Sequence, residues 1–145
     1  MGRIKQSQIT YWCHEIIRSQ AEAGGCYIDA TMGKGNDTLF LCELAGENGK
    51  VLAFDIQQEA LDATRELLRT HGKEQQAKLI LDGHEHMDRY AMEESTDVIC
   101  FNFGYLPGGD HKLATTYQTS IEAIGKGLGI LKHGGMMSLC IYSGG

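Results

Sequence analysis

The sequence predicts a doubly wound α/β fold, in which a parallel sheet carries helices on both faces. Short apolar stretches alternate along the chain with segments of helical periodicity, and this alternation is typical of strand–helix–strand units. The stretch from Asp97 to Phe103 is nearly all apolar, as expected of a strand that is covered on both faces. A glycine turn at residues 33–35 follows the first strand. With right-handed crossovers, it predicts the strand order 3-2-1-4-5 and a binding site at the carboxyl ends of the first and fourth strands.

The first part of the chain is expected to form a helix, a strand and a second helix. A helix over residues 7–23 can be capped by the serine at its start, and a pair of glycines follows it. Tyr11 and Trp12 lie beside the apolar face of this helix, where we expect them to pack in the core; a cover over a ligand pocket is the alternative role. Residues 26–28 predict the first strand, and the periodicity of residues 36–45 predicts the next helix, which ends at a turn-rich segment.

The rest of the chain continues the alternation of strands and helices. Strands are expected where short apolar runs occur, and helices are expected where apolar residues recur at helical spacing. A short helical piece is expected to follow His84-Glu85-His86 and to end near Met92, and a polar loop is expected from Asn102 to Thr116. The other expected strands are residues 50–54, 78–81, 97–103 and 136–142, and the other expected helices are residues 58–70 and 117–131.

The composition is typical of one globular domain. The chain has 145 residues, of which 42% are hydrophobic and 22% are charged. We expect neither a membrane helix nor a signal peptide, because no apolar run is long enough. The five cysteines are irregularly spaced, so we expect reduced, mostly buried thiols in a cytoplasmic protein rather than a zinc site or a disulfide framework. The net charge of −6 argues against broad non-specific binding of nucleic acid, but it allows a local basic patch.

The segment Asp29-Ala-Thr-Met-Gly-Lys-Gly-Asn-Asp-Thr38 links the first strand to the next helix and predicts a nucleotide-type binding site. Gly33 and Gly35 let the backbone turn tightly and approach a ligand, because glycine has no Cβ. The amide groups at the start of the following helix face the same space and favour an anionic group. About 20 residues after Gly35, Asp55 ends the second strand, where a carboxylate suits the hydroxyl groups of a ribose.

The spacing of the acidic residues helps to select the ligand. A dinucleotide-binding turn would have a glycine where this chain has Thr38, and Asp29 precedes the turn in the pattern D-x-x-x-G-x-G. A carboxylate at that place repels a pyrophosphate and attracts a cationic amino group, such as the one in the methionine half of S-adenosylmethionine. The methyl donor S-adenosylmethionine is therefore favoured over NAD as the cofactor, and Asp29 is a candidate cofactor-binding residue.

Polar residues also follow the other expected strands. Gln57, just beyond Asp55, is placed to reach the sugar or the edge of adenine. Asp82 and His84 can read the exocyclic amine of adenine, and a helix cap or a turn residue is the alternative role of Asp82. The pair His84-x-His86 has no third ligand at a recognisable spacing, so we expect no metal site.

The segment Asn102-Phe-Gly-Tyr-Leu-Pro-Gly-Gly-Asp110 is the second informative stretch, since it holds the single proline at the end of the most hydrophobic strand. An asparagine followed by an aromatic residue can accept a hydrogen bond from a substrate amine and stack on a flat base. Methyl transfer mainly requires alignment of the nucleophile and removal of its water, and an amine must also be neutral, so an acceptor or base has a role. A structural turn at residues 107–109 is the alternative interpretation. The candidate catalytic residues are Asn102, Tyr105 and Asp110.

These motifs, together with Phe54-Asp-Ile-Gln57 and Asp82-Gly-His84, resemble the YtqB-type putative rRNA methylase family. The resemblance runs from about Asp29 to the last residue. It implies a Rossmann-like, class I, S-adenosylmethionine-dependent methyltransferase, and some members of that family methylate the aminomethyl group on the wobble uridine of bacterial tRNA. By resemblance, residues 102–110 and Tyr142 would face the substrate, whereas Lys34 stands where relatives usually have Asn. By resemblance, the cofactor-binding residues are Gly33, Gly35, Asn36, Asp37, Asp55, Gln57 and His84.

We therefore expect residues 1–145 to form a single methyltransferase domain with tRNA as its substrate and partner. Members of the family continue beyond Tyr142 into a helix and a final pair of strands, so the C-terminal strands are expected to be missing here. The resulting edge at the fifth strand predicts either a longer parent chain or a homodimer that pairs there. An rRNA or small-molecule methyltransferase, and a cofactor-binding module without activity, are the alternatives.

Overall fold

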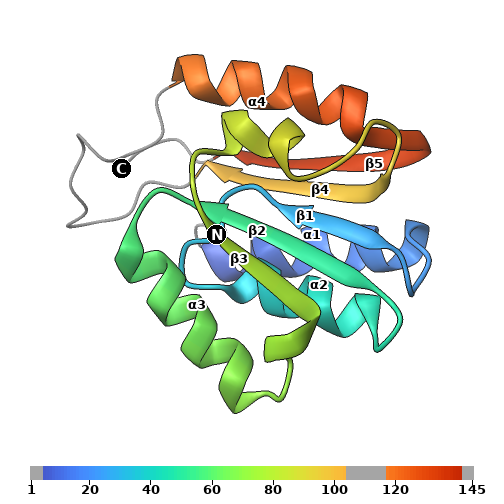
Figure 1. Ribbon diagram of the computed structural model, residues 1–145. Coiled ribbons are helices and arrows are strands. Elements are labelled where there is room, and N and C mark those ends of the chain that lie inside the picture. Colours follow the sequence, from blue (N-terminus) through green and yellow to red (C-terminus); the bar gives the residue numbers. More distant parts are fainter. Residues whose placement is uncertain (1–4, 104–116, 142–145) are drawn as a thin grey trace.

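The computed structural model describes residues 5–103 and 117–141 (Figure 1). Its helices are α1 (Gln6–Gln20), α2 (Asn36–Ala45), α3 (Gln58–Thr70) and α4 (Tyr117–Ile130), with the short 3₁₀ helices η1 (Glu74–Gln76) and η2 (His84–Arg89). Its strands are β1 (Cys26–Asp29), β2 (Lys50–Asp55), β3 (Ala77–Leu81), β4 (Thr96–Phe103) and β5 (Leu131–Ile141). The alternation of strands and helices that the sequence predicts is confirmed.

The five strands form one sheet in the order β3-β2-β1-β4-β5, and each neighbouring pair is parallel. The predicted strand order is therefore also confirmed. Strand β1 lies in the middle, and β3 and β5 are the two edges (Figure 1). The direction of winding reverses between β1 and β4. Ligands of such sheets bind at the carboxyl ends of the two strands that flank this reversal.

The ends of α1, η2 and β5 differ most from the expectation. Helix η2 begins at His84, before the expected start after His86, and ends at Arg89 rather than near Met92. The proposed cap at Ser7 is wrong, because Lys5 is the residue that precedes α1 and Ser7 lies in the first turn of the helix. Helix α1 ends at Gln20 because Ala21 has an extended backbone, with φ −93° and ψ 141°. Strand β5 begins before residue 136 because Leu131 already pairs with Thr96, ahead of a shift in register.

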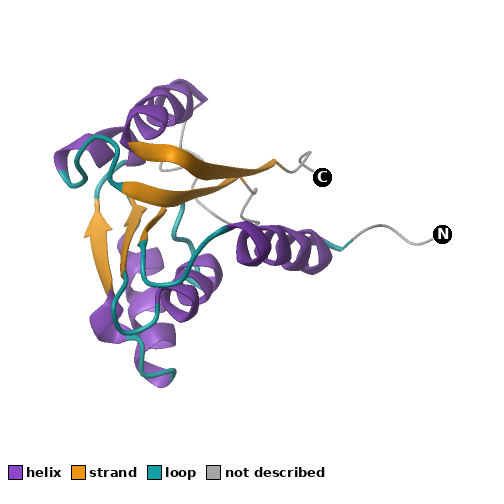
Figure 2. Cartoon of the chain, turned by 90° about the vertical axis from the view of Figure 1, so that its right-hand side faces the viewer, coloured by secondary structure: helices purple, strands orange, loops and turns teal. Residues whose placement is uncertain are grey.

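Side chains alternate between the two faces of the sheet, and both faces are covered. Tyr27 of β1 and Val98 of β4 pack on one face against α1, α2 and α3. Ile28 and Ile99, the next residues along these strands, pack on the other face against η2 and α4. Helices therefore lie on both sides of the sheet (Figure 2). This arrangement explains why β4 is almost continuously apolar. Among the residues described, no helix is long and apolar enough to cross a membrane.

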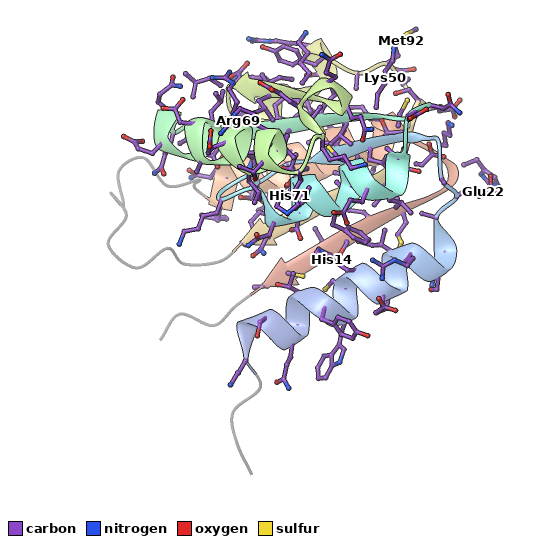
Figure 3. All side chains as sticks on the ribbon, turned by 90° about the horizontal axis from the view of Figure 1, so that it is seen from below. His14, Glu22, Lys50, Arg69, His71 and Met92 are labelled. Carbon is purple, nitrogen blue, oxygen red and sulfur yellow. The ribbon has the colours of Figure 1, made fainter. Side chains whose placement is uncertain are left out.

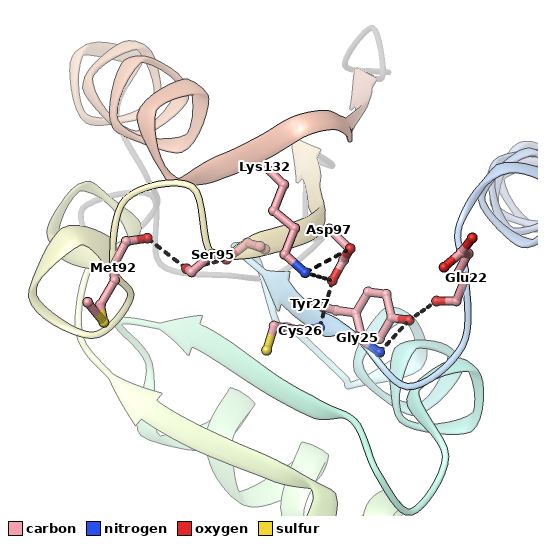
Figure 4. Close-up of polar contacts among 9 residues, drawn as sticks. Glu22, Gly25, Cys26, Tyr27, Met92, Ser95, Asp97 and Lys132 are labelled. Carbon is pink, nitrogen blue, oxygen red and sulfur yellow. Dashed lines mark hydrogen bonds and ion pairs between the residues drawn. The ribbon is translucent and has the colours of Figure 1, made fainter.

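A polar network joins the amino ends of the central strands, at the end of the sheet opposite the predicted site. The carboxylate of Asp97 accepts the backbone N–H of Cys26 at 2.9 Å and the ammonium group of Lys132 at 3.3 Å (Figure 4). The hydroxyl of Tyr27 donates to the carbonyl oxygen of Glu22. These contacts tie β1, β4, β5 and the segment after α1 together, so this end of the sheet has a structural role.

Helix α1 lies beside β5 and turns an aromatic face outward (Figure 3). Tyr11 is 60% exposed and Trp12 is 50% exposed, so the expectation that they pack in the core is wrong. The helix is attached instead through the buried Ile17 and through Cys13, whose Sγ lies 2.9 Å from Sγ of Cys140 in β5. All five cysteines are free thiols; three of them are buried, one is half-buried and one is exposed.

Candidate active site

The glycine turn between β1 and α2 has a backbone conformation that requires glycine. Gly33 and Gly35 have φ angles of +52° and +93°, which L side chains rarely adopt. A Cβ on Gly35 would also lie 2.9 Å from Oγ1 of Thr64 in α3. The hydroxyl of Thr64 donates to the carbonyl oxygen of Gly33 at 3.0 Å. The turn is therefore held against α3, and a side chain at Gly35 would displace it.

Asp55 ends β2 directly beside the glycine turn. One of its carboxylate oxygens accepts the N–H of Gly33 at 3.0 Å, and the other accepts the N–H of Gln57 at 3.0 Å. These two hydrogen bonds orient the carboxylate and leave further lone pairs on both oxygens. The structure thus brings together three residues that the sequence marks as cofactor-binding candidates. The Asp55 carboxylate at their centre can accept hydrogen bonds from hydroxyl groups such as those of a ribose.

Asp29 lies beneath the turn and is fully buried. The hydroxyl of Thr38 donates to one carboxylate oxygen at 2.6 Å, and the N–H of Thr31 donates to the other at 3.2 Å. Burial, and after it the nearby negative charge of Asp37, raises the pKa of Asp29 to about 7. Because the side chain has no exposed surface, it can act on a ligand through its negative charge but not through direct contact. A cation bound above the turn would favour the charged form.

Asp37 lies in the first turn of α2, and its hydrogen-bond partner comes from a distant helix. Nε2 of His14 in α1 lies 2.6 Å from Oδ1 of Asp37, and both side chains are mostly buried. The imidazole ring also stacks on Phe40, with ring centres 3.9 Å apart and an angle of 3° between the planes. Sequence reasoning missed His14. The available signal was its spacing, since it lies one turn before the buried Ile17 and so shares the inward face of α1.

His84 is the buried first residue of η2. Its Nδ1 lies 3.0 Å from the carbonyl oxygen of Ala30, and because a carbonyl can only accept, Nδ1 carries the proton. The ring lies against Phe101 and Phe103 of β4. Burial lowers the pKa of His84, so the ring is neutral at pH 7. Its Nε2 is therefore a buried acceptor, and it has no hydrogen-bond partner in the part of the chain that the structure describes.

Asp82 takes part in a local network at the end of β3. Its carboxylate accepts hydrogen bonds from Nδ1 of His86 at 2.7 Å, from the N–H of Gly83 at 2.8 Å and from the hydroxyl of Tyr90 at 3.2 Å. Gly83, and not Asp82, is the residue that caps η2, so Asp82 is not a helix cap. Its contacts instead stabilise the local turn between β3 and η2. No three His, Cys, Asp or Glu side chains gather into a possible metal site within residues 5–103 and 117–141.

Asn102 lies at the carboxyl end of β4, on the other side of the reversal in strand order. Its backbone N–H donates to Oγ1 of Thr31 at 2.7 Å, and its side chain is half-buried. This hydrogen bond joins the end of β4 to the segment that follows Asp29, so Asn102 lies beside the glycine turn. The other candidate catalytic residues, Tyr105 and Asp110, lie outside the described residues, and so does Tyr142. Asn36, the first residue of α2, is exposed at the edge of the turn.

The fold and the site define a class of protein. A parallel sheet of order 3-2-1-4-5, a glycine turn after β1 and an acidic residue at the end of β2 are the features of a Rossmann-like, class I methyltransferase. The family profile described as "Putative rRNA methylase" matches residues 51–145. The chain belongs to this family.

Known proteins match nearly the whole chain. A "tRNA (mnm(5)s(2)U34)-methyltransferase, chloroplastic" of Arabidopsis thaliana is 35% identical over 152 residues, which cover 99% of this chain and 54% of the relative. The crystal structure of a putative rRNA-methylase from Clostridium thermocellum is 40% identical, has a TM-score of 0.88, and is matched over 99% of this chain and 76% of that one. A putative methyltransferase from Streptococcus mutans, in complex with SAH, is 37% identical, has a TM-score of 0.81, and is matched over 97% of this chain and 74% of that one. The chain thus spans about half the length of the curated relative.

Proposed function

We propose that this chain is the core of an S-adenosylmethionine-dependent methyltransferase that modifies RNA, with the aminomethyl group of the wobble uridine in tRNA as its substrate. Membership of the rRNA methylase family supports methyl transfer to RNA. The name of the Arabidopsis relative supports tRNA as the particular substrate. The Streptococcus mutans structure supports the cofactor, because SAH is what remains of S-adenosylmethionine after methyl transfer.

The observation that carries the proposal is the acidic surroundings of the glycine turn. Asp29, Asp37 and Asp55 come from three separate elements, yet they lie close enough for the charges of the latter two to raise the pKa of Asp29. Such a group of carboxylates repels the pyrophosphate of a dinucleotide and attracts a ligand with positive charges. S-adenosylmethionine carries an ammonium group and a sulfonium group. The turn therefore suits the methyl donor better than it suits NAD.

Each residue of the site has a proposed part in holding the cofactor. Asp55 and Gln57 bind the ribose, since the Asp55 carboxylate is already oriented beside the turn. The acidic pair Asp29 and Asp37 favours the ammonium group at the methionine end. His84 is proposed on the adenine side, where its free Nε2 can accept a hydrogen bond. The backbone and side-chain groups that line the methionine end are proposed to come from Gly33, Gly35 and Asn36.

The chain has little covalent chemistry to perform in this reaction. S-adenosylmethionine supplies a methyl group that is already activated by the positive charge on sulfur. The protein has to align the substrate amine with that methyl carbon and to exclude water from it. We propose that Asn102 accepts a hydrogen bond from the amine, that Tyr105 stacks on the base, and that Asp110 accepts the proton that the amine loses.

Mass spectrometry of nucleosides tests the proposal. The protein is first titrated with S-adenosylmethionine alone and is then incubated with the cofactor and tRNA that carries aminomethyl wobble uridine. The expected product is the methylaminomethyl nucleoside in digested tRNA. Methylation of rRNA and not of tRNA would favour the substrate that the family description names. Binding without turnover would support a cofactor-binding module, and turnover on free metabolites would support a small-molecule enzyme.

A further inference from the structure

We propose that His14 is a positioning residue of the cofactor site, which holds the Asp37 carboxylate in place for the ammonium group of the cofactor. The inference rests on the proposed function, because it takes Asp37 as a cofactor-binding residue. It makes α1 part of the site, although this helix contains none of the motifs that define the site in the sequence.

The contact between the two side chains is short and directional. Nε2 of His14 lies 2.6 Å from Oδ1 of Asp37, and the side chains are each 17% exposed. A carboxylate accepts hydrogen bonds, so the imidazole donates its Nε2 proton to Oδ1. Hydrogen bonds to a charged acceptor are stronger than those between neutral groups, and partial burial strengthens them further. The bond therefore fixes the orientation of Asp37. Within residues 5–103 and 117–141, Oδ2 has no hydrogen-bond partner, so it can accept from a ligand.

The imidazole ring is itself held in one orientation. It stacks flat on Phe40, with the ring centres 3.9 Å apart, and Phe40 is a buried residue one turn after Asp37 in α2. The guanidinium group of Arg18, one turn after His14 in α1, lies 5.1 Å from the centre of the same Phe40 ring. His14 and Arg18 thus cover one face of α2 at its first turn. Figure 3 shows His14 on the side of α1 that faces the rest of the chain.

Asp37 needs such a partner because a second carboxylate lies nearby. The charge of Asp37 helps to raise the pKa of the buried Asp29, so the two carboxylates repel each other. Without a donor, the Asp37 side chain would have a lower free energy if it turned away from Asp29 toward water. Its Oδ2 would then leave the methionine end of the site. The N–H of His14 offsets this repulsion by donating a hydrogen bond to Oδ1 of Asp37. The pair therefore keeps two acidic groups close together at the place where the ligand is positively charged.

A purely structural role is the competing explanation, since the same contacts also attach α1 to α2. Two variants separate the possibilities. His14→Phe keeps a flat ring that can stack on Phe40 but removes the donor, whereas His14→Gln supplies an amide N–H at about the position of Nε2. Ser19→Ala is the matched control, because Ser19 lies on the exposed side of α1 and its hydroxyl only bonds to the backbone of Ile16.

Calorimetric titration with SAH, and with an SAH analogue that lacks the α-amino group, tests the proposal, and thermal unfolding of each variant monitors the fold. We expect His14→Phe to bind SAH roughly tenfold more weakly than the parent, His14→Gln to recover most of the affinity, and Ser19→Ala to match the parent. The deaminated analogue should bind the parent and His14→Phe almost equally well, because it lacks the group that Asp37 is proposed to hold. A structural role would instead lower the affinity for both ligands together with the unfolding temperature.

The variant Asp37→Asn distinguishes a failure of this inference from a failure of the proposed function. If Asp37→Asn loses affinity for SAH and His14→Phe does not, the positioning role of His14 is wrong while the cofactor site stands. If Asp37→Asn binds SAH like the parent, the cofactor role of Asp37 is wrong and the inference falls with it. If the parent itself binds no SAH, both proposals are overturned. If His14→Phe does not fold, His14→Ala and His14→Asn replace it, because neither places a donor near Oδ1. Full affinity of these variants for SAH would also overturn the role of His14.

Discussion

Removal of the Asp55 carboxylate is the most direct perturbation of the proposed ribose site. This carboxylate accepts the N–H groups of Gly33 and Gln57 at 3.0 Å each, and in the proposal its remaining lone pairs accept the ribose hydroxyls. A hydrogen bond to a charged group contributes about 1.5–3 kcal/mol, so Asp55→Ala should weaken cofactor binding by roughly tenfold to a hundredfold. The substitution also leaves the Gly33 N–H without its acceptor. Loss of this hydrogen bond would displace the glycine turn and would also weaken cofactor binding.

Calorimetric titration with S-adenosylmethionine measures this change in affinity. Asp55→Asn keeps one acceptor oxygen and removes the charge, so its loss should be smaller than that of Asp55→Ala. Asp62→Ala is the matched control, because it removes an exposed carboxylate from α3 outside the site. Thermal unfolding shows whether a variant has lost its fold rather than a ligand contact. If Asp55→Ala binds as tightly as the parent, the ribose assignment is wrong.

Three further predictions address the substrate side, the buried acid and the sheet edge. Asn102→Ala should lower turnover and leave cofactor affinity nearly unchanged, as measured by a methyl-transfer assay and calorimetry; an equal loss of both would place Asn102 in the cofactor site or in the structural frame. Because the pKa of Asp29 rises from 3.8 to about 7 on folding, its protonation stabilises the fold at low pH, and this contribution is lost as the pH rises toward 7. Asp29→Asn, which stays neutral, should therefore gain unfolding temperature relative to the parent between pH 4 and pH 8, and a difference independent of pH would contradict the assignment. At the edge strand β5, Leu139 is 44% exposed and Ile141 is 74% exposed, so we expect the chain to self-associate in size-exclusion chromatography with light scattering and Ile141→Lys to weaken the association. A stable monomer of the parent chain would refute the last prediction.

Much of the fold could be predicted because it depends on local patterns. The alternation of apolar runs and helical periodicity located the strands and α-helices that the structure describes, but not the 3₁₀ helix η1, and the handedness of the crossovers gave the strand order. The sequence also predicted that Gly33, Asp55 and Gln57 lie together, and their hydrogen bonds show that they do. Residues at the carboxyl ends of parallel strands must meet at one edge of a sheet, so their meeting follows once the strand order is known. Helix ends were less predictable: α1 begins after Lys5, which has no side-chain acceptor, although Ser7 offers one.

The sequence by itself thus determined the class of fold, the nucleotide-type turn and the acidic residues around it, because each of these depends on spacing along the chain. Only the tertiary structure decided how α1 is used. Trp12 was expected in the core and is half exposed. His14, which belongs to no motif, forms a hydrogen bond from α1 to Asp37 in α2. The full burial of Asp29 was also hidden, and with it the raised pKa that burial and the charge of Asp37 produce. Burial and charge proximity depend on how helices dock on the sheet, and that docking is set by the packing of many side chains at once rather than by the residues next in sequence.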